Sequence, residues 1–236
     1  MAKAKEFLNV VNPPLLSYPD WALLSDIYDI PGLHCMTGIV AKLIGEIEKS
    51  FANNENTREG TYFVELFLEA NNIHRTVYQC SNSFEGNHAR QLLRVINRMR
   101  LEVENLSEET DVDKPRIFKI IDTIQTFDWV VESCFSKELI GDYEGAIKSF
   151  SRLYTDLHNN FGVSVTVKVH LVMAHLIPQI NKRHPGYGIG VLTEQSFESA
   201  HHEFKLEWQK TKLAMNHSDY PKALFDCVVR YIYIPF

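Results

Sequence analysis

Apolar residues recur at helical spacing in one segment after another, and this pattern most constrains how the chain can fold. The alternation of polar and apolar residues that marks half-buried strands is scarce. We therefore expect a mainly α protein with one short strand at 74–80. The predicted helices cover 33–51, 61–70, 87–103, 114–135, 142–161, 164–183, 192–204 and 221–234.

The segment 87–103 is the most strongly amphipathic of these. One stripe carries five apolar residues, and the opposite face carries Arg90, Arg94 and Arg98 at steps of four; the apolar five are Leu92, Leu93, Ile96, Met99 and Val103. An arginine row at this spacing can neutralise successive phosphates of DNA. A solvated helix face explains the same row, so both readings stay open.

Charge and cysteine usage narrow the class of protein. The net charge is -6, so there is no global basic field, and any nucleic-acid contact must come from a local patch. Four cysteines lie far apart without a CxxC pair, which favours reduced thiols in an intracellular protein. We find no secretory signal and no run of about 20 apolar residues that would span a membrane.

His170 and His175 are candidate metal ligands. Two histidines share a zinc ion only when their nitrogens converge. On an ideal helix, a separation of five turns the two side chains about 140° apart. Convergence therefore needs a local distortion or a helix end, and spacing alone favours two partly buried histidines.

The segment "LTEQSFESAHHEF" (192–204) concentrates acids and histidines. On a helix, Glu194, Glu198, His201 and Lys205 stack along one line beside Phe197, Phe204 and Trp208. A carboxylate at the edge of an aromatic stripe is partly desolvated, which suits a metal ligand. Acids near the positive end of the helix dipole explain the segment equally well.

Two Glu-x-x-His pairs raise a further reading. Glu198 with His201 and Glu85 with His88 have the spacing used by di-metal carboxylate bundles. Such a bundle also needs single glutamates from two other helices. Gly86 lies inside one pair and argues against a regular helix there.

Five blocks in order resemble the C-terminal half of the catalytic core of Transib-type DNA transposases and of the catalytic subunit of the V(D)J recombinase. They are similar also to transposon-derived proteins of arthropods and cnidarians. The blocks extend from about Asn9 to Trp208 and read "VVNPPLL", "GLHCMTGIVAKL", "SFEGNHARQLL", "VKVHLVMAHLIPQI" and "GIGVLTEQSFESAHHEF".

This resemblance implies an extended segment at 1–31, a multi-helical insertion or zinc-type domain at 32–190, and C-terminal helices at 191–236. The last helices would complete an RNase H-like core, with the sheet largely absent. Glu198 falls on the glutamate that binds catalytic Mg²⁺ or Mn²⁺, and His170 and His175 fall on two zinc ligands. His34 and His201 are expected as neighbours of the active site. DNA as partner, a homodimer and a nuclear location are implied as well.

The family's first two catalytic aspartates and the cysteine half of its zinc site lie upstream of the first block. The sequence contains no counterparts of them. Two-metal chemistry needs several carboxylates, so we expect this chain to be inactive unless a missing N-terminal transposase portion joins it.

Three hypotheses follow. In the first, the chain is the C-terminal part of a DDE-type transposase that cleaves and transfers DNA strands. In the second, it is a transposon-derived, non-catalytic module that binds DNA or a protein. In the third, it is a di-metal carboxylate bundle using Glu85, His88, Glu198 and His201.

Overall fold

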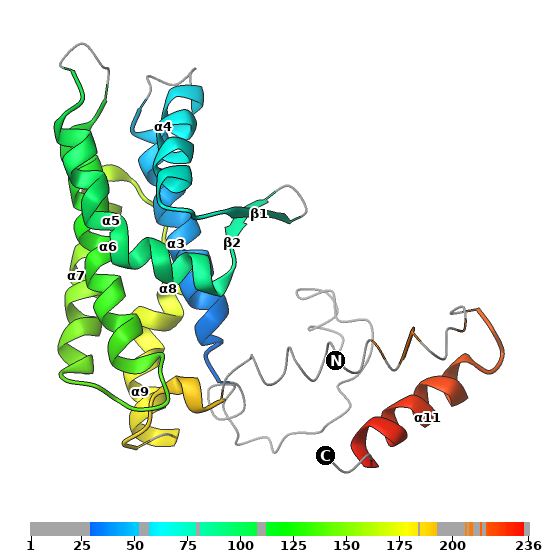
Figure 1. The fold of residues 1–236 in the computed structure, drawn as a ribbon. Helices are drawn as coiled ribbons and strands as arrows, with labels where there is room; N and C mark the ends of the chain where they lie inside the picture. Colours follow the sequence, from blue (N-terminus) through cyan, green and yellow to red (C-terminus); the bar gives the residue numbers. More distant parts are fainter. Residues whose placement is uncertain are drawn as a thin grey trace.

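The computed structural model describes residues 29–51, 57–78, 81–107, 112–183, 185–192, 206, 208–209, 213 and 216–233. Across these residues the protein is mainly helical, with one two-stranded sheet (Figure 1). The mainly α prediction is confirmed. No helix in the described part is long and apolar enough to cross a membrane.

Helix α3 (Gly32–Lys49) is the central element of the bundle. It packs against α4 (Thr57–Ala70), α5 (Gly86–Glu104) and α6 (Lys114–Cys134). Its buried positions include Ile39, Leu43, Ile44 and Ile47, all fully excluded from solvent. Burial on several sides explains why apolar residues dominate this helix.

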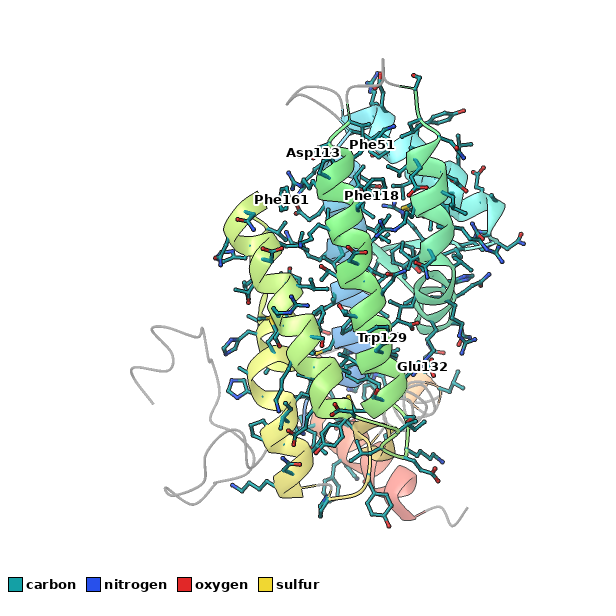
Figure 2. The ribbon with its side chains drawn as sticks, turned by 90° about the vertical axis from the view of Figure 1, so that its left-hand side faces the viewer. Phe51, Asp113, Phe118, Trp129, Glu132 and Phe161 are labelled. Atoms are coloured by element: carbon teal, nitrogen blue, oxygen red, sulfur yellow. The ribbon has the colours of Figure 1, made fainter. Side chains whose placement is uncertain are left out.

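Helices α5, α6 and α7 (Tyr143–Phe161) follow one another with short connections. Figure 2 shows Asp113 and Phe161 near one end of the bundle and Glu132 near the other, so α6 and α7 run antiparallel. Asp113 and Asp142 cap the starts of α6 and α7 by accepting hydrogen bonds from backbone N–H groups. The apolar stripe predicted on α5 is buried as expected.

A β-hairpin connects α4 to α5. Strand β1 (Arg75–Tyr78) pairs antiparallel with β2 (Ser81–Phe84), and Arg75 lies opposite Phe84. Arg75 pairs with Glu48 of α3 at 2.6 Å and with Glu65 of α4 at 2.9 Å, which anchors the hairpin to both helices. The sequence predicted β1 but not β2, because "SNSF" is polar and its strand conformation depends on pairing with β1.

The segment predicted as a helix at 164–183 is helical from Val167 to Arg183 but not uniformly. Helix α8 (Val167–His170) leads into a π-helix, η1 (Leu171–His175), and then into α9 (Leu176–Arg183). Gln179 of α9 holds the residues that lead into α3. Its side-chain oxygen accepts a hydrogen bond from the backbone N–H of Ile30 at 3.1 Å, and its side-chain amide donates to Asp29 at 2.6 Å. A short 3₁₀ helix, η2 (Ile189–Leu192), and a C-terminal helix, α11 (Tyr220–Tyr233), follow.

Several sequence predictions concern residues outside this description. They include nearly all of the N-terminal segment and, except for Leu192, the candidate helix at 192–204, with Glu194, Glu198 and His201, as well as Lys205. The three described cysteines, Cys35, Cys134 and Cys227, are buried and form no disulfide with one another.

Candidate functional site

The side chains of His170 and His175 converge on one side of the α8–α9 helix. Their Nε2 atoms are 3.2 Å apart. The ring centroids are separated by 5.0 Å, and the rings meet edge to face at 75°. Both residues are exposed rather than partly buried as the spacing suggested.

The π-helix between the two histidines brings them together. Its hydrogen bonds run from residue i to residue i+5, so the turn from His170 to His175 is wider than an α turn. Pro178 supplies a local reason for this turn, because proline has no N–H and its ring clashes with the carbonyl of Ala174. Such widened turns occur often at functional sites.

The inner face of the same segment holds the histidines in place. Val169, Val172 and Leu176 are fully buried in the core. Thr166 caps the start of α8, its hydroxyl accepting from Val169 N at 3.4 Å. The outward direction of the two imidazoles is therefore set by packing on the opposite side of the helix.

The separation of the two nitrogens suits shared coordination of a metal ion. With Zn–N bonds of about 2.0 to 2.1 Å and tetrahedral angles, two ligating nitrogens lie about 3.3 Å apart. The same separation suits a hydrogen bond in which one neutral imidazole donates to the other. The hydrogen bond uses the lone pair of one Nε2 atom and the N–H of the other, whereas a shared metal ion uses the lone pairs of both, so the metal would take the place of the proton between them.

The pair by itself offers two nitrogen donors to a metal ion. Within the described ranges, no group of three or more His, Cys, Asp or Glu side chains is arranged to hold a metal ion. Structural zinc has four protein ligands, so two more donors would have to come from elsewhere. Glu198 and His201 lie outside the described residues, and the catalytic carboxylate site stays a prediction.

The three arginines of α5 lie beside other side chains. Arg98 donates to Asn71 at 3.1 Å, and Arg94 lies 3.9 Å from Glu132 of α6. Burial and the nearby Glu132 raise the pKa of Asp128, while Arg94 and Arg90 act in the opposite direction. The negative charges of acids on α6 therefore partly offset the positive charge of the three arginines. The role of these arginines as phosphate contacts stays a prediction.

The Glu85-x-x-His88 pair does not lie on a continuous helix. Glu85 is the N-cap of α5 with extended backbone, and the helix begins at Gly86. The Nδ1 atom of His88 accepts a hydrogen bond from the backbone N–H of His74 at 3.4 Å, and the two rings meet edge to face. This geometry does not provide the shared helical face that the di-metal hypothesis assumes.

His34 is exposed on the first turn of α3. One turn further along, the side chain of Lys168 lies directly over Gly38 and leaves no space there for a Cβ atom. Because Lys168 precedes His170 by two residues, His34 and the histidine pair lie on neighbouring helices.

No protein-family model, curated protein or solved structure matches this chain. The resemblance to transposases in the five sequence blocks therefore remains a prediction. The histidine pair is the feature on which a functional proposal can be built.

Proposed function

We propose that this chain is the C-terminal part of a DDE-type DNA transposase or recombinase, and that His170 and His175 are half of a structural zinc site. The observation that carries the proposal is the 3.2 Å separation of the two Nε2 atoms. A separation of five residues does not bring two side chains together on a regular helix. In this chain a π-helix occupies the five residues that follow His170 and end at His175.

Other features support the pairing as a ligand set. Both imidazoles are exposed, so a third and fourth ligand can approach from solvent. Neutral imidazole nitrogen is a common zinc donor, and zinc is satisfied by nitrogen and sulfur together. In the proposal, the missing donors are thiolates of an N-terminal transposase portion or of another chain.

In the finer form of this proposal, residues 32–190 are a helical insertion or zinc-type domain, and residues 191–236 end an RNase H-like core. Glu198 would then hold catalytic Mg²⁺ or Mn²⁺ together with two aspartates supplied by an N-terminal transposase portion. Such a site supplies an activated oxygen nucleophile for DNA cleavage and strand transfer. A homodimer and a nuclear location belong to the same proposal.

Zinc binding tests the proposal directly. We expect Zn²⁺ added to the metal-free chain to bind the pair, and binding to be lost in His170→Ala and in His175→Ala. His88→Gln is a matched control, because His88 and His74 also meet edge to face, with centroids 5.2 Å apart, while His88 Nδ1 accepts from the backbone. Equal zinc binding by wild type and the three variants would overturn the metal role of the pair. Two irons bound per chain would instead favour the di-metal bundle.

A non-catalytic module derived from a transposon is the second candidate. The observation that favours it is that the buried core continues from α3 to α9 without the two histidines, which are exposed. On this candidate we expect the fold to be stable without zinc, unlike small zinc-dependent domains.

The two candidates differ in what Glu198 does. We expect a nuclease to lose DNA cleavage in Glu198→Ala once the N-terminal portion of a relative is supplied. A binding module keeps its affinity for DNA or protein in the same variant. Cleavage activity of the combined proteins and binding of the single chain can be measured on one preparation.

A further inference from the structure

The outward side of the α8–α9 segment carries an apolar strip that contains the histidine pair. Its members follow the helical spacing i, i+3, i+4, i+7, i+8 and i+11, and they are Val167, His170, Leu171, Ala174, His175 and Pro178. Val167 is 75% exposed, Ala174 and Pro178 are exposed as well, and Leu171 is partly buried against the core. The two imidazoles therefore stand in an apolar surface rather than a charged one.

This segment has no carboxylate of its own that could complete a metal site. Between Gly162 and Arg183 the sequence contains neither aspartate nor glutamate. The side chain of Lys168 lies against Gly38 of α3. In the part of the chain that the structure describes, no third His, Cys, Asp or Glu side chain joins the pair. The strip thus offers a metal ion two neutral nitrogen donors.

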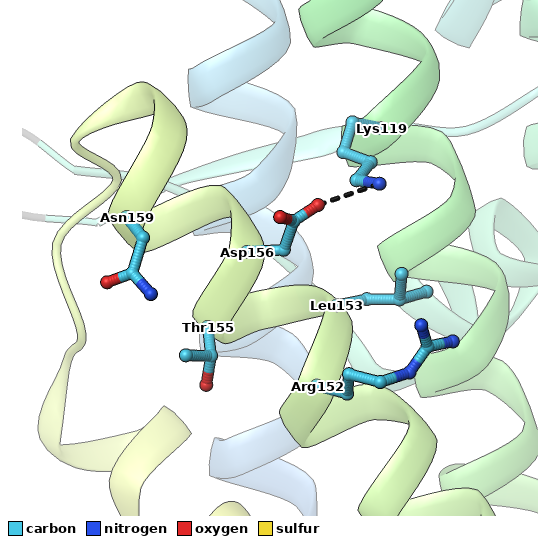
Figure 3. Close-up of a pocket in the computed structure, with 6 residues that line it drawn as sticks. All are labelled: Lys119, Arg152, Leu153, Thr155, Asp156 and Asn159. Atoms are coloured by element: carbon cyan, nitrogen blue, oxygen red, sulfur yellow. Dashed lines mark ion pairs between the residues drawn. The ribbon is translucent and has the colours of Figure 1, made fainter.

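The surface hollow between α6 and α7, about 340 Å³ in volume, offers no comparable site (Figure 3). Of the side chains that line it, only Asp156 is acidic, and none is a histidine or a cysteine. Asp156 forms an ion pair with Lys119 at 2.7 Å and accepts a hydrogen bond from Asn160 at 2.6 Å. Its carboxylate is therefore already engaged, and the histidine pair remains the better position for a metal ion.

Two donors from each of two chains complete a tetrahedral zinc site. Zinc takes four ligands, and the nitrogens of such a site lie about 3.3 Å apart. The Nε2 atoms of His170 and His175 are already 3.2 Å apart. A two-fold axis through the metal ion adds a second, identical pair, because a two-fold interface uses the same surface of both partners. The apolar strip of one chain then packs against the apolar strip of the other.

We propose that a second copy of this chain completes the site, so that one zinc ion on a two-fold axis is held by His170 and His175 of both copies. The inference rests on the metal role of the pair in the proposed function. It names the partner that supplies the other two donors when no thiolates are bound.

The size and the charge of this interface make the dimer depend on the metal ion. The strip from Val167 to Pro178 is about 16 Å long and about 10 Å wide, far less than the roughly 800 Å² that a stable interface buries on each partner. Two chains that each carry a net charge of -6 also repel each other. A divalent cation between them reduces this repulsion. The two copies should therefore separate when zinc is removed.

Sedimentation velocity of the full chain, with Zn²⁺ and with EDTA, tests the inference together with metal analysis of the dimer. We expect a monomer in EDTA, and a dimer with one zinc ion per two chains in Zn²⁺. His170→Ala should abolish this dimer.

Val167→Arg keeps both ligands but places a cation on each side of the interface, so the Kd of the zinc-loaded dimer should rise at least about tenfold. Leu101→Arg is the matched control, because Leu101 is 60% exposed on α5 and the substitution should leave this Kd unchanged. Circular dichroism of each variant establishes that the fold is intact.

A zinc-loaded monomer with one zinc ion per chain would overturn the inference and leave the metal role of the pair in place. A dimer that persists in EDTA would overturn it too, as would equal weakening by Val167→Arg and Leu101→Arg. A peptide with a CxxC pair separates the inference from the proposed function, in which thiolates displace the second copy and give monomers with one zinc ion each. A zinc dimer that excess peptide leaves intact would support the inference and count against the thiolate half of the proposed function.

Discussion

Arg116 of α6 and Glu46 of α3 form an ion pair in which Nη2 lies 2.7 Å from Oε2 of a carboxylate that is only 5% exposed. The other oxygen of Glu46 accepts from Lys42 and Lys49, each at 2.8 Å. One buried carboxylate therefore takes three cationic donors. This cluster joins α3 to α6 at the end of the bundle where α6 begins.

Removing the charge of Glu46 should destabilise the protein. Glu46→Gln leaves three cations around a neutral amide, and the loss of one partner of a buried pair typically costs about 3 kcal/mol or more in the free energy of unfolding. Urea unfolding measures this difference. Glu132→Gln is the control, because Glu132 is 55% exposed and lies 3.9 Å from Arg94; we expect a change within about 0.5 kcal/mol. Similar stabilities of the two variants would contradict the role of the cluster.

The same carboxylate should make stability depend on pH in acid. Burial is the largest single influence and pushes the pKa of Glu46 upward, but the hydrogen bonds and the positive charges of Lys42 and Lys49 together outweigh it, and the pKa is lowered below its ordinary value of 4.5. A lowered folded-state pKa contributes stability that is present above the unfolded pKa and is lost as pH falls through the folded pKa.

We therefore expect wild type to lose stability more steeply than Glu46→Gln below about pH 4.5. Between pH 5 and 7 the difference should be constant. Unfolding free energies of both proteins from pH 7 down to pH 3 measure it, and other carboxylates cancel in the difference. Parallel curves throughout this range would count against the assignment.

Two helical glycines should respond in opposite directions to alanine. A Cβ on Gly60 would overlap the backbone carbonyl of Glu48, where α4 crosses close to α3, whereas a Cβ on Gly45 would meet nothing within 4 Å. Gly60→Ala should therefore destabilise by about 1 to 3 kcal/mol through forced backbone movement. Gly45→Ala should stabilise by about 0.5 to 1 kcal/mol, since alanine favours the helix. Chemical denaturation measures the unfolding free energy of both variants. Equal effects of the two substitutions would contradict the close contact of α4 with α3 at Gly60.

Pro178 should control the geometry of the histidine pair. In Pro178→Ala the missing N–H is restored, so the segment can form regular α-helical hydrogen bonds. A regular helix turns His170 and His175 apart, and we expect zinc affinity to fall at least about tenfold, as for a lost ligand. Unfolding free energy should stay the same or rise. Isothermal titration with Zn²⁺ measures the affinity, and undiminished binding would show that the proline does not determine the pairing.

Local sequence patterns were sufficient for most of the helices. The apolar stripe of α5 and the extent of α6 could be predicted because the spacing of apolar side chains along a helix acts within a few residues. Strand β2 was missed because its residues have little preference for a strand. Its conformation arises only when it pairs with β1 and when Arg75 is held by Glu48 and Glu65.

For the candidate site, the sequence by itself determined the identity and spacing of His170 and His175. It also placed Pro178 three residues after His175. It did not determine that the two nitrogens meet, because a separation of five on a regular helix predicts divergence. The tertiary structure decided this: burial of Val169, Val172 and Leu176 fixes the inner face, and the widened turn rotates both imidazoles outward to the same side. Pairings over long sequence distances, such as Arg116 with Glu46, likewise exist only once the helices have packed.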